Sequence, residues 1–385
     1  MDDRDDQQEA SAESIKLLRT TSKCTSLAVL QLRLRLLPLR LQRRHQGKTD
    51  RITSSTRASV LTNSNSYKPS PPKPSPPKPK GLGLADAMLQ RGRVFHGTAL
   101  TLRGDDQELA IVNNKHDFNS ITPENSMKWE SIEPSRNNFT FQDSDRYAEY
   151  ARKEHKQIHC HNLVWHSQLP EWVSNGGFDN ATLIGIMKNH ITKLAGRYRD
   201  VCTRWDVVNE ALNENGTYRS SVWYDTIGEA FLPIAFRFAS EVAPNAELYY
   251  NDYNLEYNND KTAGAKRIVE LVQSYGIKIN GVGFQAHLTS EPTGTSADIT
   301  PSQLGLETAL TTMTDLGVDV VYTEIDIRMN TPATPEKVEA QKAAYERVSR
   351  SCLGVKRCIG MTVWGVSDKY SWIPETFPGE GSANL

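Results

Sequence analysis

The sequence predicts an α/β protein of the (β/α)8 barrel class, the TIM barrel. From Gly81 onward, eight short apolar segments alternate with longer segments whose apolar residues recur at helical spacing. Strands separated by helices indicate a parallel sheet, and eight such strands close into a barrel. Chemistry in this class lies where the strands end, and polar residues of this chain gather at those positions.

The predicted strands and helices follow one another in regular order. The strands are expected at Val94–Leu100, Phe118–Thr122, Gln157–Asn162, Arg204–Asn209, Glu247–Asn251, Gly281–Ala286, Asp319–Glu324 and Ile359–Trp364. The main helices are expected at Asp143–Glu154, Asn180–Tyr198, Thr226–Val242, Asp260–Tyr275, Pro301–Leu316 and Pro335–Arg350.

The residues before the barrel lack the alternation of strand and helix patterns. In residues 1–66 an acidic start precedes an apolar stretch and then an Arg/Leu-rich run, whereas a secretory signal places its positive charge first. We expect a disordered or misannotated leader with no recognisable signal peptide. The alternative, a membrane-surface helix, is disfavoured because Pro38 interrupts it. Residues 67–80 favour a stiff proline-rich linker, with an SH3 ligand as the alternative, and residues 81–385 form the barrel domain.

Composition excludes several classes of partner. The net charge of −1 argues against nucleic acid or an acidic membrane as the main partner. No run approaches the length of apolar residues that a transmembrane helix needs. The hydrophobic content of 38% is that of an ordinary globular core.

Four of the cysteines bear on the fold. Cys352 and Cys358 are close enough in sequence to clip a loop, and we favour a disulfide there; free thiols are the alternative for a cytosolic protein. Cys160 is expected near the end of one strand and Cys202 at the start of the next. The two thiols then lie at opposite ends of neighbouring strands, and we expect them not to pair.

Two glutamates stand at the ends of similar predicted strands. Glu210 follows the apolar stretch Trp205–Val208, and Glu324 follows Val318–Val321. A carboxyl group at such a position is poorly solvated, and poor solvation raises a carboxyl pKa, as a general acid requires. A strand that merely meets a loop is the alternative for either residue alone. Two such glutamates far apart in sequence are what cleavage of a glycosidic bond needs.

The other strand ends carry amides, imidazoles, a lysine and tryptophans. Sugars offer hydroxyls to the polar groups and C–H faces to the indoles, so this set indicates a carbohydrate groove. Metal binding is the alternative for His159 and His161, which lie two apart on one strand. A zinc site needs a further ligand close by, and we favour hydrogen-bonding histidines.

Seven segments together resemble the motifs of a known family. They are WDVVNEA, TEIDIR, HNLVWHSQLP, ITPENSMKWE, YYNDYN, GFQAH and TVWGVSDKYSWIP. In order and across residues 81–385, they are similar to those of family 10 glycoside hydrolases, the endo-1,4-β-xylanases, in their fungal form. The resemblance implies a secreted, monomeric enzyme that acts on xylan and xylo-oligosaccharides and needs no cofactor or metal.

The same resemblance implies roles for individual residues. Glu210 is expected to be the acid/base and Glu324 the nucleophile of a retaining endo-xylanase, with Glu210 in the drier position. Asn209 is expected to bond the 2-hydroxyl of the sugar, and His287, held by Asp326, to orient Glu324. The glycone-side subsites are expected to be lined by Glu124, Asn125, Lys128, His161, Trp165, Gln285, Trp364 and Trp372. Tyr253 and Asn254 are expected to face the leaving group.

The chain departs from the family's pattern at both ends. A secretion signal is not recognisable, and the final helix, which in the family packs between the last strand and the first, is missing. We therefore expect the outer faces of these strands, with Val363 and Phe95 or Val94, to lack cover. Two rival functions stay open: a retaining barrel hydrolase acting on another β-glycan, and an inactive carbohydrate-binding protein.

Overall fold

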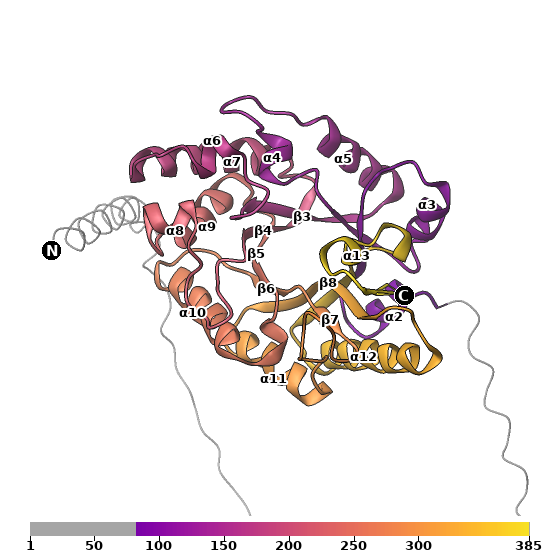
Figure 1. Ribbon diagram of the computed structural model, residues 1–385. Helices are drawn as coiled ribbons and strands as arrows, with labels where there is room; N and C mark the ends of the chain where they lie inside the picture. The colour runs from indigo at the N-terminus through magenta and orange to yellow at the C-terminus, as the bar shows by residue number, and fades with distance from the viewer. Residues whose placement is uncertain (1–81, 385) are drawn as a thin grey trace, which may run out of the picture. The chain divides into compact units, whose positions relative to one another are not determined.

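The computed structural model describes residues 82–384, whose centre is a closed barrel of eight parallel strands (Figure 1). In barrel order the strands are β1 (Phe95–Leu100), β2 (Ser120–Pro123), β3 (Gln157–Val164), β4 (Cys202–Asn209), β5 (Glu247–Asp252), β6 (Gly281–Phe284), β8 (Asp319–Asn330) and β9 (Cys358–Val363). β9 pairs with both β8 and β1, which closes the barrel. The predicted TIM-barrel class is confirmed. The predictions for residues 1–66 and 67–80 concern residues outside the described part.

Helices surround the strands on the outside of the barrel (Figure 1). They are α2 (Leu84–Gln90), α3 (Asp106–Asn113), α4 (Trp129–Ile132), α5 (Gln142–Glu154), α6 (Glu171–Ser174), α7 (Asn180–Arg197), α8 (Val222–Ile227), α9 (Phe231–Val242), α10 (Asp260–Ser274), α11 (Gln303–Thr314), α12 (Pro335–Gly354) and α13 (Ile373–Thr376). Side-chain caps set several starts: Asp179 accepts from the Thr182 N–H before α7, and Thr334 accepts from Lys337 before α12. The single helix predicted over Thr226–Val242 is wrong, because the chain breaks at Gly228, whose φ is 72°.

Large side chains fill one layer of the barrel interior. Phe95, Tyr249 and Val321 form a small cluster that is fully buried. Two facing positions are glycines because the rings leave no room for a side chain. A Cβ at Gly281 would lie 2.1 Å from the Tyr249 ring, and one at Gly360 would lie 2.4 Å from the Phe95 ring.

The strand that carries Glu324 is longer than predicted. β8 continues to Asn330 because two short strands pair with its second half: β7 (His287–Thr289) in parallel and β10 (Glu380–Gly381) antiparallel. Glu324 therefore lies within a strand rather than at its end. The prediction of a strand-terminal residue is wrong at this position and correct at Glu210, which directly follows β4.

Two disulfides are present in the described residues. Cys352–Cys358, with Cα atoms 5.2 Å apart, agrees with the prediction. Cys160–Cys202, with Cα atoms 5.7 Å apart, contradicts it. The error lies in the register: Ile158 of β3 is opposite Cys202, so Cys160 lies only two residues further along. Both cysteines therefore occupy the same end of neighbouring strands.

The side chains at the junction of β9 and β1 are mostly buried. Phe95 points into the barrel interior and Val363 is 6% exposed, whereas Val94 is 41% exposed. The expectation that Val363 and Phe95 lack cover is therefore wrong, and it holds only for Val94. Phe95 was assigned to the wrong face of its strand, and side chains alternate between faces at every residue.

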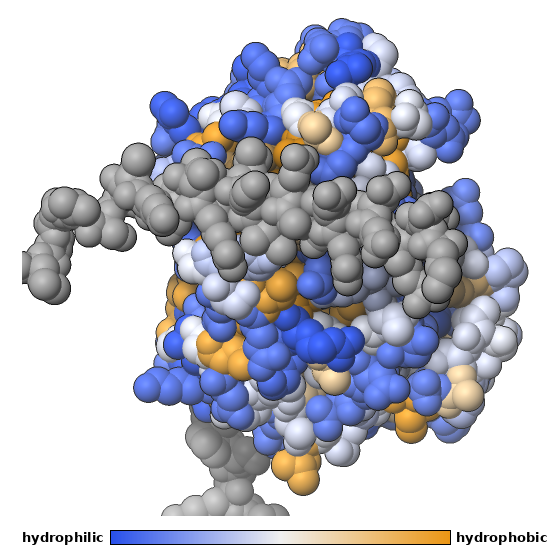
Figure 2. Space-filling model, turned by 90° about the vertical axis from the view of Figure 1, so that its left-hand side faces the viewer, coloured by the Kyte–Doolittle hydropathy of each residue, from blue (hydrophilic) through white to orange (hydrophobic). Residues whose placement is uncertain are grey.

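The surface is mixed in character. Figure 2 shows mainly hydrophilic side chains on the face it presents, with apolar residues in scattered patches. Within residues 82–384, no helix combines the length and apolar character that a membrane span requires.

Candidate active site

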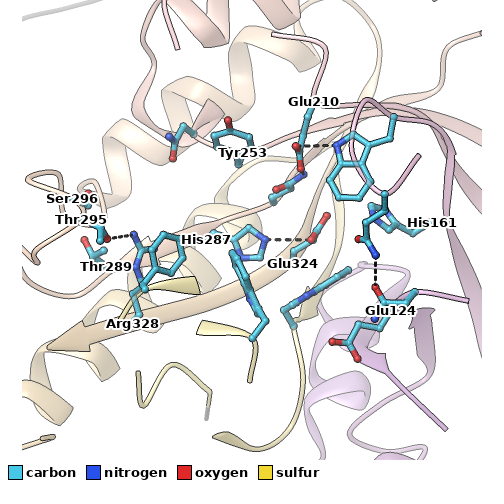
Figure 3. A pocket seen from close by; sticks show the side chains of 18 of the residues that line it. Glu124, His161, Glu210, Tyr253, His287, Thr289, Thr295, Ser296, Glu324 and Arg328 are labelled. Atoms are coloured by element: carbon cyan, nitrogen blue, oxygen red, sulfur yellow. Dashed lines mark hydrogen bonds and ion pairs between the residues drawn. The ribbon is translucent and has the colours of Figure 1, made fainter. Parts of the chain in front are cut away.

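A cavity of about 630 Å³ opens at the carboxyl ends of the barrel strands. Glu210 and Glu324 both border it, and it extends from Glu124 on one side to Thr295 on the other (Figure 3). The predicted residues that line it are Glu124, Asn125, Lys128, His161, Trp165, Glu210, Tyr253, Asn254, Gln285, His287, Glu324, Trp364 and Trp372. Asn209 and Asp326 lie directly behind the lining and bond to it. The structure thus brings all the predicted carbohydrate-site residues together.

Glu324 is a buried carboxylate held by nitrogen donors. Its side chain is in contact with His287, whose Nε2 lies 3.2 Å from Oε2, and with Asn251, whose Nδ2 donates to Oε1 over 2.8 Å. Burial alone would raise the pKa of Glu324, but His287, His161 and Asn251 lower it below its ordinary value. The residue is therefore ionised although it is only 4% exposed.

His287 is the main source of that effect. Its Nδ1 lies 2.9 Å from Asp326, which also accepts a hydrogen bond from Trp372 Nε1 over 2.8 Å. Burial alone would lower the pKa of His287, but the carboxylates of Asp326 and Glu324 raise it to about 10. At neutral pH the ring is an imidazolium that donates hydrogen bonds from both nitrogens, and the carboxylate of Glu324 accepts one of these hydrogen bonds (Figure 3).

Glu210 lies in a different environment. Its backbone adopts a left-handed conformation with φ of 55°, which turns the side chain into the cavity at the end of β4. Three N–H groups reach its carboxyl: Trp165 Nε1 at 2.9 Å, Gln285 Nε2 at 3.0 Å and Asn209 Nδ2 at 3.2 Å. The carboxyl is half-buried, whereas Glu324 is buried, so the expectation that Glu210 occupies the drier position is wrong.

Asn251 links the two glutamates and was given no role from the sequence. Its Nδ2 donates to Glu324 Oε1 and also, over 2.9 Å, to Asn209 Oδ1. Its own Oδ1 accepts from the Thr323 hydroxyl over 2.7 Å, which fixes the orientation of the amide. A polar residue at the end of the fifth strand indicates a site residue, but the contact of Asn251 with Asn209 depends on how β4 pairs with β5.

His159 and His161 share one carboxylate. Asp206 accepts from His159 Nε2 over 2.8 Å and from His161 Nδ1 over 2.9 Å. Burial alone would raise the pKa of Asp206, but the two histidines lower it to about 2. Within residues 82–384, no group of three or more His, Cys, Asp or Glu side chains is arranged to hold a metal ion. The two histidines are hydrogen-bonding residues, as predicted, and Asp206 is the partner that sequence reasoning missed.

One side of the cavity is rich in polar groups around a lysine. Lys128 Nζ donates to Asn125 over 2.8 Å and to Gln168 over 2.6 Å, and it lies 5.1 Å from the centre of the Trp165 ring. Burial lowers the pKa of this lysine. Gln168 also lines the cavity and was not predicted.

The opposite side holds Tyr253 and Asn254, together with a wall that the sequence analysis missed. This wall comprises Tyr257, Thr289, Thr295, Ser296, Arg328 and Phe377. Arg328 is bonded to Glu380 over 2.7 Å and lies over the Phe377 ring. The wall exists because β8 extends beyond Glu324 and β10 brings the C-terminal segment beside it. These residues were not predicted as site residues because the strand was expected to end at Glu324.

The chain is similar to known proteins over most of its length. Residues 83–385 match glycosyl hydrolase family 10. The chain is 62% identical over 308 residues to endo-1,4-beta-xylanase 2 of Aureobasidium pullulans, covering 80% of this chain and 85% of that protein. It is 58% identical over 303 residues to endo-1,4-beta-xylanase A of Fusarium oxysporum f. sp. lycopersici, covering 79% and 93% of the two chains.

A solved structure shows the same architecture. The family 10 xylanase from Bispora sp. MEY-1, determined with xylobiose, superposes with a TM-score of 0.75 at 38% identity, covering 79% of this chain and 92% of that one. The family match to residues 83–385 includes the strands that carry the two glutamates. The chain therefore belongs to glycosyl hydrolase family 10.

Proposed function

We propose that the chain is an endo-1,4-β-xylanase that hydrolyses internal β-1,4-xylosidic bonds of xylan with retention of anomeric configuration. The observation that carries the proposal is the contrast between two glutamates in one cavity. Glu324 is buried and kept ionised by His287 and Asn251, whereas Glu210 is half-buried at the end of β4. Glu324 is thus suited to attack, whereas Glu210 borders the same cavity and can exchange a proton with a leaving group or a water there.

The reaction takes two displacements. In the first, a Glu324 oxygen bonds to the anomeric carbon as the glycosidic bond breaks, and Glu210 gives its proton to the departing oxygen. In the second, the ionised Glu210 takes a proton from water, whose oxygen bonds to the anomeric carbon and displaces Glu324. Atoms and charges balance without a cofactor or a metal.

The surrounding residues bind the sugar. Asn209 bonds the 2-hydroxyl of the sugar that is attacked; its amide contacts Glu210 and is held by Asn251, which also bonds Glu324. The subsites on the glycone side comprise Glu124, Asn125, Lys128, His161, Trp165, Gln285, Trp364 and Trp372. Tyr253 and Asn254 contact the leaving group. The names of the relatives, and the xylobiose in one related structure, support xylan as the substrate.

Release of reducing sugar from xylan, β-glucan and mannan, measured side by side, tests the proposal. Rapid cleavage of xylan alone, with the β-anomer seen first by NMR, is the expected result. Faster cleavage of glucan or mannan would indicate a retaining hydrolase of another β-glycan. Binding to xylan without cleavage would indicate a carbohydrate-binding protein, and initial release of the α-anomer would overturn the double displacement.

The proposal also covers the location and the oligomeric state of the enzyme. Two disulfides in the described residues support folding in an oxidising compartment, and hence secretion. We also propose that the protein acts as a monomer, which analytical ultracentrifugation of the purified chain tests.

A further inference from the structure

A small hairpin follows the acid/base residue. Residues 211–219, here called the β4 hairpin, leave the end of β4 and return, with a bridge between Leu212 and Tyr218 and a hydrogen bond from Asn213 N–H to Thr217 O of 2.8 Å. The returning arm ends at Arg219, whose N–H donates to Ala211 O over 2.8 Å. Arg219 is thus eight residues beyond Ala211 in sequence but beside it in space.

The guanidinium of Arg219 joins two parts of the site. Nε donates to the Glu210 carbonyl oxygen over 3.1 Å, and Nη2 donates to Leu212 O over 3.1 Å. The same Nη2 donates to the Tyr253 hydroxyl over 2.7 Å. One rigid, planar group therefore contacts both the backbone of the acid/base and the tyrosine at the end of β5.

The backbone that Arg219 contacts is a strained one. Glu210 is not a glycine, yet its φ is 55°, a conformation that costs energy and persists only where the surroundings enforce it. Its N–H donates to Asn251 O over 2.9 Å on one side, and its carbonyl accepts from Arg219 on the other. Removal of the second contact frees the peptide that aims the Glu210 side chain.

Tyr253 is braced from the same hairpin. Lys261, whose side chain is 0% exposed, lies 3.2 Å from the centre of the Tyr253 ring and pairs with Glu214 of the hairpin over 3.0 Å. Glu214 also accepts from Asn254 Nδ2 over 3.0 Å. The β4 hairpin therefore holds both residues that face the leaving group, through Arg219 and Glu214.

We infer that Arg219 is a positioning residue that aligns the acid/base Glu210 with the leaving-group platform at Tyr253. The inference rests on the proposed function, because it assigns a role within that reaction. A sugar bound against Tyr253 is then presented to Glu210 in a fixed geometry, so proton transfer to a sugar leaving group depends on Arg219. An aryl leaving group that needs little protonation does not depend on it.

The test compares two substrates and two arginines. In Arg219→Met, kcat/KM for xylotetraose should fall about ten- to a hundredfold, because small misplacement of a catalytic group has effects of that size. For p-nitrophenyl β-xylobioside it should fall less than about threefold. For Arg219→Lys, kcat/KM on xylotetraose should lie between the values of Arg219→Met and wild type. Arg267→Met is the matched control, since Arg267 bonds Gly216 O in the same hairpin and should leave both substrates near wild type.

Three results would overturn the inference: equal losses on both substrates, no loss on xylotetraose, or the same leaving-group dependence in Arg267→Met. If Arg219→Met does not fold, a double-mutant cycle of Arg219→Lys with Tyr253→Phe decides. If the double variant loses less kcat/KM on xylotetraose than the product of the two single-variant losses, the contact between Arg219 and Tyr253 is supported. If the double-variant loss equals that product, the contact is refuted. Wild-type enzyme that fails to cleave xylotetraose refutes the proposed function and this inference with it. Cleavage by wild type without the expected variant pattern refutes this inference alone.

Discussion

His287 lies between two carboxylates, with Nε2 3.2 Å from Glu324 and Nδ1 2.9 Å from Asp326. The pair of carboxylates raises the pKa of the ring to about 10, so the group between them is a cation at neutral pH. A buried carboxylate is costly unless it is paired and hydrogen-bonded. The imidazolium meets both conditions for Glu324, and solvent is not required to keep the carboxylate ionised.

Glu324→Ala should lower kcat on xylan at least about a thousandfold, because the attacking group is removed. Binding of xylotetraose, measured by calorimetry, should stay close to wild type. Azide should restore cleavage of an activated substrate and give the α-glycosyl azide, since it enters from the vacated face. Glu339→Ala, a change of an exposed glutamate on α12, is the control and should be fully active. A kcat of Glu324→Ala close to that of wild type would show that Glu324 is not the nucleophile.

Glu210→Ala should affect poor leaving groups far more than good ones. On xylotetraose kcat/KM should fall about a hundredfold or more, while on an aryl glycoside with an acidic phenol it should change little, because such a phenol departs without a proton. Rates for a series of aryl β-xylobiosides of different phenol pKa measure this dependence. Equal losses along the whole series would show that Glu210 is not the acid.

The free energy of unfolding should depend on pH through His287. Its folded pKa of about 10 is above the ordinary value. The stabilisation is therefore fully present below about pH 6.5 and is lost as pH rises through about 10. Urea unfolding of wild type and His287→Gln at pH 6 and at about pH 9.5 measures this contribution. The difference in stability between the two proteins should shrink at the higher pH, and a constant difference would contradict the assigned protonation.

The chain contains three acceptor sequences for N-glycosylation, at Asn138, Asn180 and Asn215. Asn138 and Asn215 are exposed, whereas Asn180 is half-buried in the first turn of α7 and donates to Thr226 O over 3.2 Å. The Asn215 oxygen accepts from both Thr217 N–H and its hydroxyl. We predict glycan mainly at Asn138, which peptide mass spectrometry of protein secreted from a eukaryotic host would detect. Secreted protein without glycan, or with glycan at Asn180 alone, would contradict this.

The sequence was sufficient for the barrel and for most side chains that line its cavity. Strand ends in a parallel barrel meet at one rim, so residues such as Lys128 and Trp364 could be brought together without knowledge of the exact register. Contacts that depend on register could not be predicted. The expectation that Cys160 and Cys202 lie at opposite ends of their strands assumed the wrong strand register. In the structure Ile158 pairs with Cys202, so the two cysteines are close together.

The solvation of the glutamates was also beyond the reach of the sequence. A position after a buried strand suggested that Glu210 was the drier residue, but its left-handed backbone turns the side chain toward the open cavity. Glu324 is buried because β8 continues past it and pairs with β7. The role of Asn251 likewise depends on the barrel bringing β4, β5 and the more distant β8 around one cavity, which no single segment of sequence records.

The Cys160–Cys202 disulfide makes a covalent ring of the chain between its two cysteines, which are separated by 42 positions. The connection between α6 and α7 lies inside this ring and includes Gly176 and Gly177, both exposed. A protease that cuts there opens the ring but does not release a fragment, since the two halves of the barrel remain tethered through sulfur. Digested enzyme should therefore migrate as one species on a denaturing gel without thiol and as two once reductant is added.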